Sequence, residues 1–370
     1  EDYTDAIVLK NDHNPGSIVV TPKMQGRVMS STVAGDQGKS LGWVNHELIA
    51  TGKIKKHFTP YGGEDRFWLG PEGGQFSIFI TPGKEMKFDN WYVPAAFNTE
   101  PWKMTSKTGN VVTVEKEMTL SNYSGMEFDL QANRTIRLLD ASRVQKLLNV
   151  QIPDGVQFVA YQTENRIENT GEKPWTKETG TVSIWILSQF TPAPGVTVAI
   201  PFKKGSENNL GPIVTTAYFG EISSQRLKVD KDNGIVYFKM DGKKRRKLGL
   251  SPQRSRAVEG SYDETNHILT IMQFNKPQQN PGYVNQLWKH QEHPFNGNVE
   301  FAYNDGPLED GSQLGPFFEM ESSSPAAFLA PGDSITHNHR IFHFSGSEPQ
   351  LSNISNAVLG VSIEQIKSAF

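Results

Sequence analysis

Residues 61–79 combine more kinds of functional group than any other stretch of the chain. They contain three carboxylates, one guanidinium and one indole: Glu64, Asp65, Glu72, Arg66 and Trp68. Two glycine pairs flank these side chains, and glycine permits a positive φ or a close approach of another backbone. Carboxylates, a fork-shaped donor and a flat ring are the groups that bind sugars. We therefore predict binding or catalysis here; the alternative is a strained hairpin whose charges pair with one another.

A second acidic pair lies in residues 317–325. On a strand, Glu319 and Glu321 would point to one face, and Phe318 and Met320 to the other. Two carboxylates on a mostly apolar strand are costly to desolvate unless they are paired or functional. Burial also raises the pKa of a carboxyl group, which suits acid–base chemistry. Glu319, Glu321 and Glu64 are therefore the candidate catalytic residues; the alternative is that the first two face solvent.

Histidines and another tryptophan form two further candidate groups. Residues 288–295 are rich in donors and aromatic surface, and we expect a loop in which Trp288, His290 and His293 contact substrate; the alternative is a packed surface loop. The other group would share one strand face, and comprises His337, His339 and His343. Histidines at alternate positions can bind a metal. No acidic partner has a suggestive spacing, so they are only weak candidates, and we predict neither a metal nor a cofactor.

A basic run at residues 243–247 follows a turn signal at Asp241 and Gly242. We interpret it as a solvated loop between strands; the alternative is a contact with an anionic substrate or surface.

The composition excludes several classes of protein. The chain has 370 residues and a net charge of -3, which argues against a nucleic-acid partner. It has no cysteine, so disulfides, thiolate metal sites and cysteine nucleophiles are excluded. No apolar run is long enough to span a membrane. The chain starts at Glu1 rather than methionine, so we expect a removed leader and a periplasmic or cell-surface location in a bacterium. The oligomeric state stays open.

The dominant hydrophobic period is two, which predicts an all-β fold. Residues 112–120 and 126–138 alternate apolar and polar side chains around a turn, and residues 227–229 and 235–240 form a second such pair. Further strand-like runs occur at residues 18–21, 76–81, 156–162, 182–187, 196–200, 213–219, 268–274, 299–303, 317–321 and 335–344. Helix signals are restricted to residues 141–148 and 363–370. We predict one domain, residues 1–370, built as a large antiparallel sandwich with few short helices.

Three passages resemble the aldose 1-epimerases of the galactose mutarotase-like superfamily. They are residues 19–28 with Arg27, residues 166–175, and the strand of Glu319 and Glu321 before a Leu-x-Pro-Gly turn at residues 329–332. Residues 62–75 resemble instead an uncharacterised group of exported bacterial proteins within that superfamily, and this match is the closer one. The resemblance implies a β-supersandwich with a concave, sugar-binding face.

In mutarotases a carboxylate removes the proton of the anomeric hydroxyl while a histidine protonates the ring oxygen. The resemblance assigns the base to Glu321 or Glu319 and a sugar-positioning role to Arg27. The strand at residues 181–187 lacks the histidine that the family carries there.

The missing histidine favours carbohydrate recognition, with a mono- or oligosaccharide bound in a concave cleft. One alternative is a carbohydrate-active enzyme, epimerase- or glycosidase-like, that uses paired carboxylates. The other is a structural component of a glycan-uptake system. We expect Arg27, Glu64, Arg66 and at least one of Glu319 and Glu321 to line the same cavity.

Overall fold

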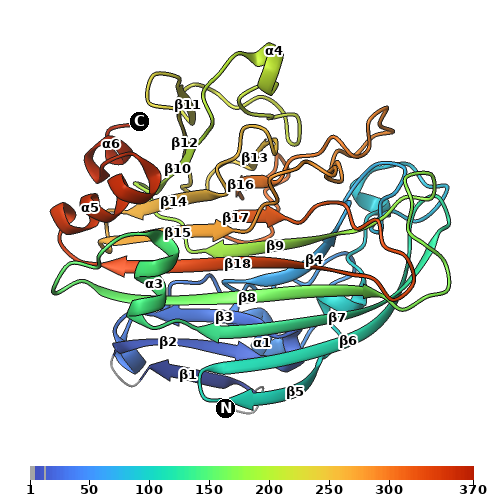
Figure 1. Cartoon of the computed structure of the whole chain (residues 1–370), viewed down its shortest axis with the longest axis horizontal. Helices are drawn as coiled ribbons and strands as arrows, with labels where there is room; N and C mark the ends of the chain where they lie inside the picture. Colours follow the sequence, from blue (N-terminus) through green and yellow to red (C-terminus); the bar gives the residue numbers. More distant parts are fainter. Residues whose placement is uncertain (1–4, 12–13) are drawn as a thin grey trace.

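The computed structural model describes residues 5–11 and 14–370, and antiparallel sheets dominate it (Figure 1). The largest sheet has ten strands in the order β11-β12-β10-β14-β15-β18-β8-β7-β6-β5. In that order they are Leu227–Asp230, Ile235–Lys239, Thr197–Pro201, Val258–Asp263, Ile268–Phe274, Ser334–Ser345, Gln157–Asn169, Glu127–Leu138, Val111–Ser121 and Lys103–Thr108.

A five-stranded sheet lies against the ten-stranded one and has the order β13-β16-β17-β9-β4. These strands are Arg246–Leu250, Glu300–Asn304, Phe318–Ser323, Ser183–Phe190 and Arg66–Gly70. A three-stranded sheet completes the fold with β1 (Ile7–Asn11), β2 (Asn14–Thr21) and β3 (Arg27–Thr32).

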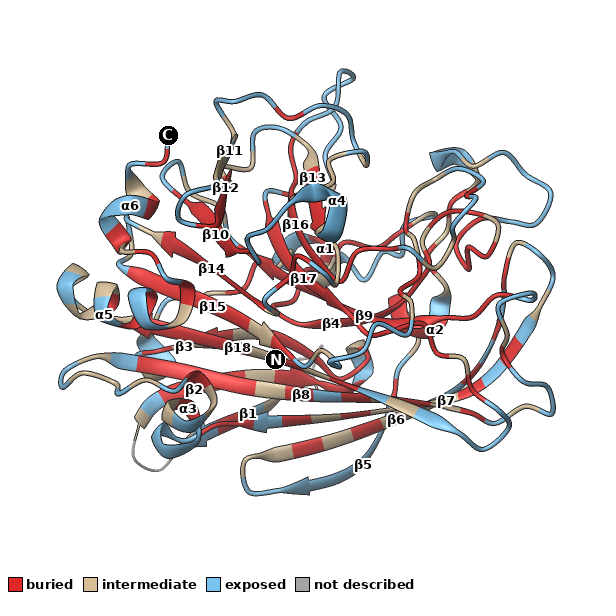
Figure 2. Ribbon diagram, turned by 45° about the horizontal axis from the view of Figure 1, so that its top comes forward, coloured by how far each residue is buried: buried red, intermediate tan, exposed pale blue. Residues whose placement is uncertain are grey.

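The main hydrophobic core lies between the sheets, because each strand turns every second side chain inward. On β7, Phe128, Ala132 and Ile136 are buried in this core, together with Ile184 from β9 and Met320 from β17. Strands β9, β16 and β17 are buried along their whole length, and Figure 2 shows β14, β15 and β17 as largely buried. Since Ile184 and Met320 face this core, their neighbours along β9 and β17 point to the other side of the five-stranded sheet.

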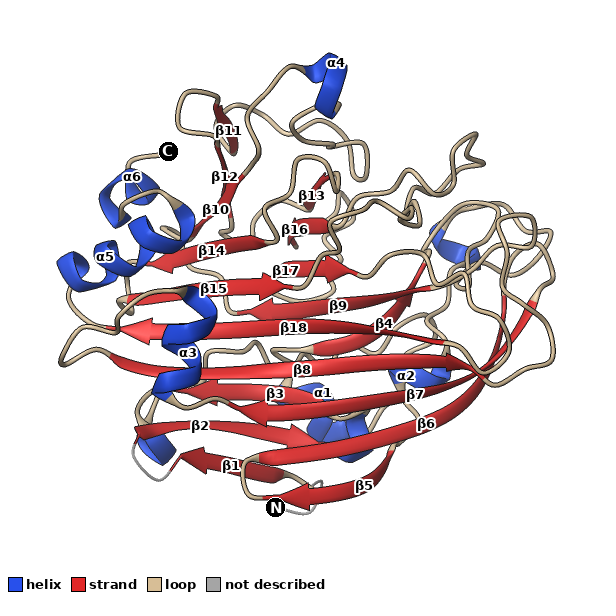
Figure 3. Ribbon diagram, viewed as in Figure 1, coloured by secondary structure: helices blue, strands red, loops and turns tan. Residues whose placement is uncertain are grey.

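Helices are short and few in the described part of the chain (Figure 3). They are α1 His46–Thr51, α2 Ala95–Asn98, α3 Ala141–Leu148, α4 Glu207–Leu210, α5 Glu348–Leu359 and α6 Ile363–Lys367. The helices α3, α5 and α6 pack on the outer side of the ten-stranded sheet, where Val144, Leu351 and Ile366 contribute to a second core cluster. No helix in the described ranges is long and apolar enough to cross a membrane.

Most of the expected elements are confirmed. Both hairpins form, β6 with β7 and β11 with β12. Helices α3 and α6 form within the two predicted ranges. Asp140 caps the first turn of α3, and α6 has a capping box between Ser362 and Gln365. Residues 76–81 and 213–219 are not strands, so those two expectations are wrong. They are loops that contribute apolar side chains to the core, and their apolar spacing alone does not distinguish the two cases.

Candidate functional site

Two rows of residues cross the five-stranded sheet and form the floor of the site. In the first, Lys247, Tyr303, Glu319 and Gln189 are paired in register across four neighbouring strands. The second row consists of residues paired in the same way across four strands, namely Phe301, Glu321, Leu187 and Arg66. Residues two apart on a strand share a face, so both rows present their side chains on the same side. Distant parts of the sequence therefore meet here through strand register.

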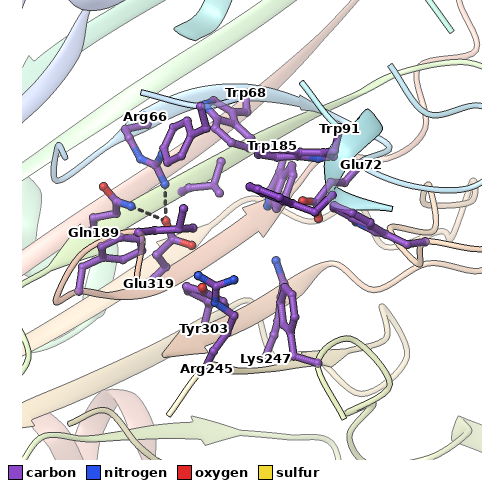
Figure 4. Close-up of a pocket in the computed structure, with 17 residues that line it drawn as sticks. Arg66, Trp68, Glu72, Trp91, Trp185, Gln189, Arg245, Lys247, Tyr303 and Glu319 are labelled. Atoms are coloured by element: carbon purple, nitrogen blue, oxygen red, sulfur yellow. Dashed lines mark hydrogen bonds and ion pairs between the residues drawn. The ribbon is translucent and has the colours of Figure 1, made fainter. Parts of the chain in front are cut away.

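A cavity with a volume of about 90 Å³ opens over this floor. Four tryptophans line it, namely Trp68, Trp91, Trp185 and Trp288, with the phenylalanines Phe58, Phe88, Phe219 and Phe317. Its polar lining consists of Arg66, Glu72, Gln189, Arg245, Lys247, Tyr303 and Glu319. Figure 4 shows Arg66, Gln189 and Glu319 on one side and Glu72, Trp91 and Trp185 on the other. Aromatic walls with a few convergent polar groups are typical of a small-molecule site.

Arg66 and Glu319 form a buried ion pair at one end of the cavity. Gln189 Nε2 donates to the same carboxylate oxygen at 2.9 Å. Burial raises the pKa of Glu319 to about 8, although the Arg66 charge opposes that shift. Arg66 Nε and Nη1, Gln189 Oε1 and Trp68 Nε1 are buried and have no hydrogen-bond partner among the described residues. This end therefore offers donors and an acceptor to a polar ligand.

Glu321 lies one row further along the floor and is already saturated with partners. Lys247 Nζ lies 2.9 Å from its Oε1 and 2.7 Å from its Oε2. Trp185 Nε1 donates to Oε2 at 2.8 Å. The Lys247 ammonium also lies 4.6 Å from the Trp185 ring centroid, within cation–π range. Glu321 thus serves to hold Lys247 and Trp185 at the cavity, whereas Glu319 lines the cavity itself.

Glu72 reaches the cavity from the loop after β4. Gln286 Oε1 accepts a hydrogen bond from the Glu72 backbone N–H at 2.5 Å, which ties this loop to residues 284–288. The loops approach closely at Gly73, where a Cβ atom would lie 2.6 Å from the Leu287 carbonyl oxygen. Burial raises the pKa of Glu72 to about 7, and the Lys247 charge opposes that shift. The cavity thus contains two carboxyl groups whose pKa values lie near neutrality.

Glu64 and Asp65 do not line the cavity. Glu64 accepts hydrogen bonds at 2.7 Å from both the backbone and the hydroxyl of Ser31, and lies 2.8 Å from His343 Nε2. Asp65 forms a buried ion pair with Arg134, the one charged residue on the inward face of β7. Glu64 occupies a bend before β4, where strand alternation does not apply. Both acids therefore join buried networks between the sheets.

Arg27 supports the turn before β4. Its Nη1 donates to the Gly62 carbonyl at 2.6 Å and its Nη2 donates to Gln25 Oε1 at 2.8 Å. Gly63 has a φ of 123°, and a Cβ there would lie 2.3 Å from Arg27 Cδ, so only glycine fits. Arg27 and Glu64 do not line the cavity of Arg66 and Glu319, and the expectation that all of them share one cavity is wrong.

The three histidines on β18 share one buried face and bond to hydroxyl groups. Ser322 Oγ lies 2.7 Å from His337 Nε2 and 2.8 Å from His339 Nδ1. Burial lowers the pKa of both rings to about 3, so they are neutral at physiological pH. His343 lies between Thr270 and Glu64. In the described ranges no group of three or more histidine and acidic side chains is arranged to hold a metal ion.

Of the three residues that we expect to contact substrate in residues 288–295, only one lines the cavity. Trp288 lines the cavity, and its ring stacks on Trp91 with centroids 5.9 Å apart. His290 and His293 are exposed and do not line it. Sequence reasoning missed Trp91, Trp185, Gln189, Arg245, Lys247 and Tyr303. The alternation of predicted strands could have indicated Trp185 and Gln189, and the basic run that we interpreted as a solvated loop contains the buried Lys247.

The architecture is a β-sandwich with the galactose mutarotase-like fold. The fold is similar to that of a candidate aldose 1-epimerase from Escherichia coli, with 11% identity, a TM-score of 0.53, and coverage of 91% of this chain and 99% of that one. It is also similar to a protein from Synechocystis sp. PCC 6803, with 13% identity, a TM-score of 0.52, and coverage of 93% and 96%. Over residues 1–370 the chain belongs to DUF6786, a family of unknown function. No curated protein matches the chain.

Proposed function

We propose that this protein binds a carbohydrate in the cavity above the five-stranded sheet. The observation that carries the proposal is the combination of four tryptophans with Arg66, Glu72, Gln189 and Glu319 in one cavity. Sugar rings present an apolar face to aromatic side chains and hydroxyl groups to charge-assisted hydrogen bonds. The galactose mutarotase-like fold supports the same reading.

The buried polar atoms at the Arg66 end are the proposed contacts for sugar hydroxyls. Arg66 Nε and Nη1 donate, and Gln189 Oε1 accepts. Leaving such atoms without partners costs about 1–3 kcal/mol each, so a ligand that bonds to them gains affinity.

A glycan array followed by titration calorimetry tests the proposal. We expect the wild-type protein to bind at least one sugar, and Glu319→Gln to weaken that binding about tenfold because it changes the hydrogen-bonding group beside Arg66 in the cavity. Glu172→Gln is the matched control, because Glu172 is an exposed loop residue that does not line the cavity, and this variant should bind the sugar normally. Wild-type protein that binds no sugar would refute the proposal.

A second candidate function is acid–base chemistry on the bound sugar. It is favoured by the two cavity carboxyl groups, Glu72 and Glu319, whose pKa values are raised to about 7 and about 8. Groups with pKa values near the working pH are suited to transfer protons. An epimerase-like reaction would be detected by NMR as exchange between the anomers of the sugar. A glycosidase-like reaction would be detected as release of p-nitrophenol from p-nitrophenyl glycosides. If neither reaction occurs with any sugar that binds, acid–base chemistry is excluded and sugar binding remains as the proposed function.

A further inference from the structure

A second, larger chamber adjoins the first. Its volume is about 490 Å³. The two chambers share six lining residues: Glu72, Phe88, Phe219, Arg245, Trp288 and Leu314. Cavities that hold small molecules typically measure about 300–1,000 Å³, so the inner chamber alone is small for a complete ligand. A ligand seated in the inner chamber would therefore extend into the outer one.

The outer chamber differs in chemistry from the inner one. The residues that line only the outer chamber are Tyr218, Leu287, Leu308, Ser312 and Gln313. Leucine offers neither a flat ring for stacking nor a hydrogen bond, so leucines favour an apolar group over a sugar unit. Leu314, at the border of the two chambers, adds a third aliphatic side chain.

Each polar side chain that lines only the outer chamber makes a hydrogen bond within the protein. The Tyr218 hydroxyl accepts from Asn298 Nδ2 at 2.7 Å, and Ser312 Oγ donates to Asp310 Oδ1 at 2.6 Å. Gln313 Nε2 donates to a backbone carbonyl at 3.1 Å. None of the buried atoms without partners in the described ranges belongs to a residue that lines only this chamber. The cavity residues that have unpaired buried atoms, Arg66, Trp68, Trp91 and Gln189, line only the inner chamber.

The outer chamber also exposes hydrophobic surface. Only seven large hydrophobic side chains are exposed in the described part of the chain, and Phe88, Phe219 and Leu308 are three of them. Their exposed fractions are 48%, 38% and 44%. Exposed apolar side chains that cluster around one opening mark an interaction site, whereas singly scattered ones do not.

We propose that the ligand is a glycoside whose sugar occupies the inner chamber and whose apolar aglycone occupies the outer chamber. The inference rests on the proposed function, because it requires a sugar in the inner chamber. It follows from the continuity of the two chambers and from the residues that line only one of them. Of the two chambers, only the inner one has unpaired buried polar atoms among the described residues, and Leu287 and Leu308 lie only in the outer one, with the exposed Phe88 and Phe219 at the border.

The probes are methyl and p-nitrophenyl glycosides of glucose, galactose, mannose, xylose and glucuronic acid, with disaccharides of the same sugars. Calorimetry gives the affinity of each. For the sugar that fits, we expect the p-nitrophenyl glycoside to bind about tenfold more tightly than the methyl glycoside, because the chamber takes an aromatic ring out of water. Free p-nitrophenol should bind far more weakly than its glycoside.

Three other outcomes would each contradict the inference. Equal affinities for methyl and p-nitrophenyl glycosides would overturn the inference and leave the proposed function standing. A disaccharide that gains as much as the p-nitrophenyl glycoside would show that the outer chamber is a sugar subsite, and would overturn it too. If none of the probes binds, the proposed function fails with it.

A pair of variants locates the aglycone. Leu308→Asp places a charge in the outer chamber, and we expect it to lower the ratio of p-nitrophenyl to methyl affinity about tenfold. Ile54→Asp is the matched control, because Ile54 is another exposed aliphatic residue and lines neither chamber. Its ratio should equal that of the wild type. An unchanged ratio in folded Leu308→Asp protein would place the aglycone elsewhere and overturn the inference.

Discussion

Lys247 Nζ lies 2.7 Å from Glu321 Oε2 in a buried ion pair at the floor of the cavity. Residue 247 ends a basic run, and residue 321 is one of two glutamates with the same strand orientation. Because Glu321 is bound in this ion pair, the two glutamates have different roles. Glu321 holds the floor together, while Glu319 remains beside Arg66 at the cavity surface. Of the two, Glu319 is thus the one placed to meet a ligand.

Removing one member of this ion pair should unfold the protein more readily. Lys247→Met leaves a buried carboxylate without its cation, and we expect a loss of about 3–5 kcal/mol in the free energy of unfolding. Chemical denaturation measures it. Lys103→Met, which breaks an exposed pair with Glu115, is the control and should cost less than about 1 kcal/mol. Similar losses in both variants would contradict the role assigned to Glu321.

Stability should fall as the pH rises, because of two other buried glutamates. Glu259 on β14 and Glu300 on β16 are both fully buried, and neither takes part in an ion pair within the described ranges. Burial raises both pKa values, that of Glu300 to about 8, and the Glu300 charge adds to the shift of Glu259. The folded protein therefore binds more protons than the unfolded chain between about pH 4.5 and pH 8.

Glu300→Gln should remove part of that dependence. We expect the variant to gain stability over the wild type as the pH rises through this window, by on the order of 3 kcal/mol at pH 9. Denaturation at pH 5, 7 and 9 tests the sign. A difference between variant and wild type that is the same at all three pH values would show that Glu300 does not titrate there.

If the cavity performs acid–base chemistry, its rate should report the pKa values of Glu72 and Glu319. With one group as base and the other as acid, the rate follows a bell whose limbs lie near pH 7 and pH 8. Glu72→Gln and Glu319→Gln should each lower the rate at least about a hundredfold, and any remaining activity should lack one limb. Unaltered pH profiles in both variants would exclude these residues as the acid and the base.

The aromatic wall should contribute to binding more than to folding. Trp288 is half-buried at the cavity, whereas Trp185 is enclosed in the sheet. We expect Trp288→Ala to weaken sugar binding about tenfold or more, with a loss of stability of about 1–2 kcal/mol. Trp185→Ala should cost about 3–5 kcal/mol of stability. Calorimetry and thermal unfolding separate the two effects. Normal sugar binding by Trp288→Ala would exclude its ring as a stacking surface.

The sequence by itself determined the all-β class, many of the strands and the face of each of these strands that is buried. Alternation of apolar and polar residues predicted β6, β7 and β18, and helix signals predicted α3 and α6, because these patterns depend on local geometry. It also indicated that Glu319 and Glu321 share a face, and it placed Arg66, Trp68, Glu72 and Trp288 among the candidates for the site.

Only the tertiary structure decided which candidates meet. Register across β13, β16, β17 and β9 aligns Lys247 with Tyr303, Glu319 and Gln189, and no local signal encodes register between strands so distant in sequence. The bend at Glu64 directs that acid to Ser31 and His343, while Arg66 two residues later lines the cavity. The sequence shows which functional groups the chain contains, but long-range packing decides which of these groups contact one another.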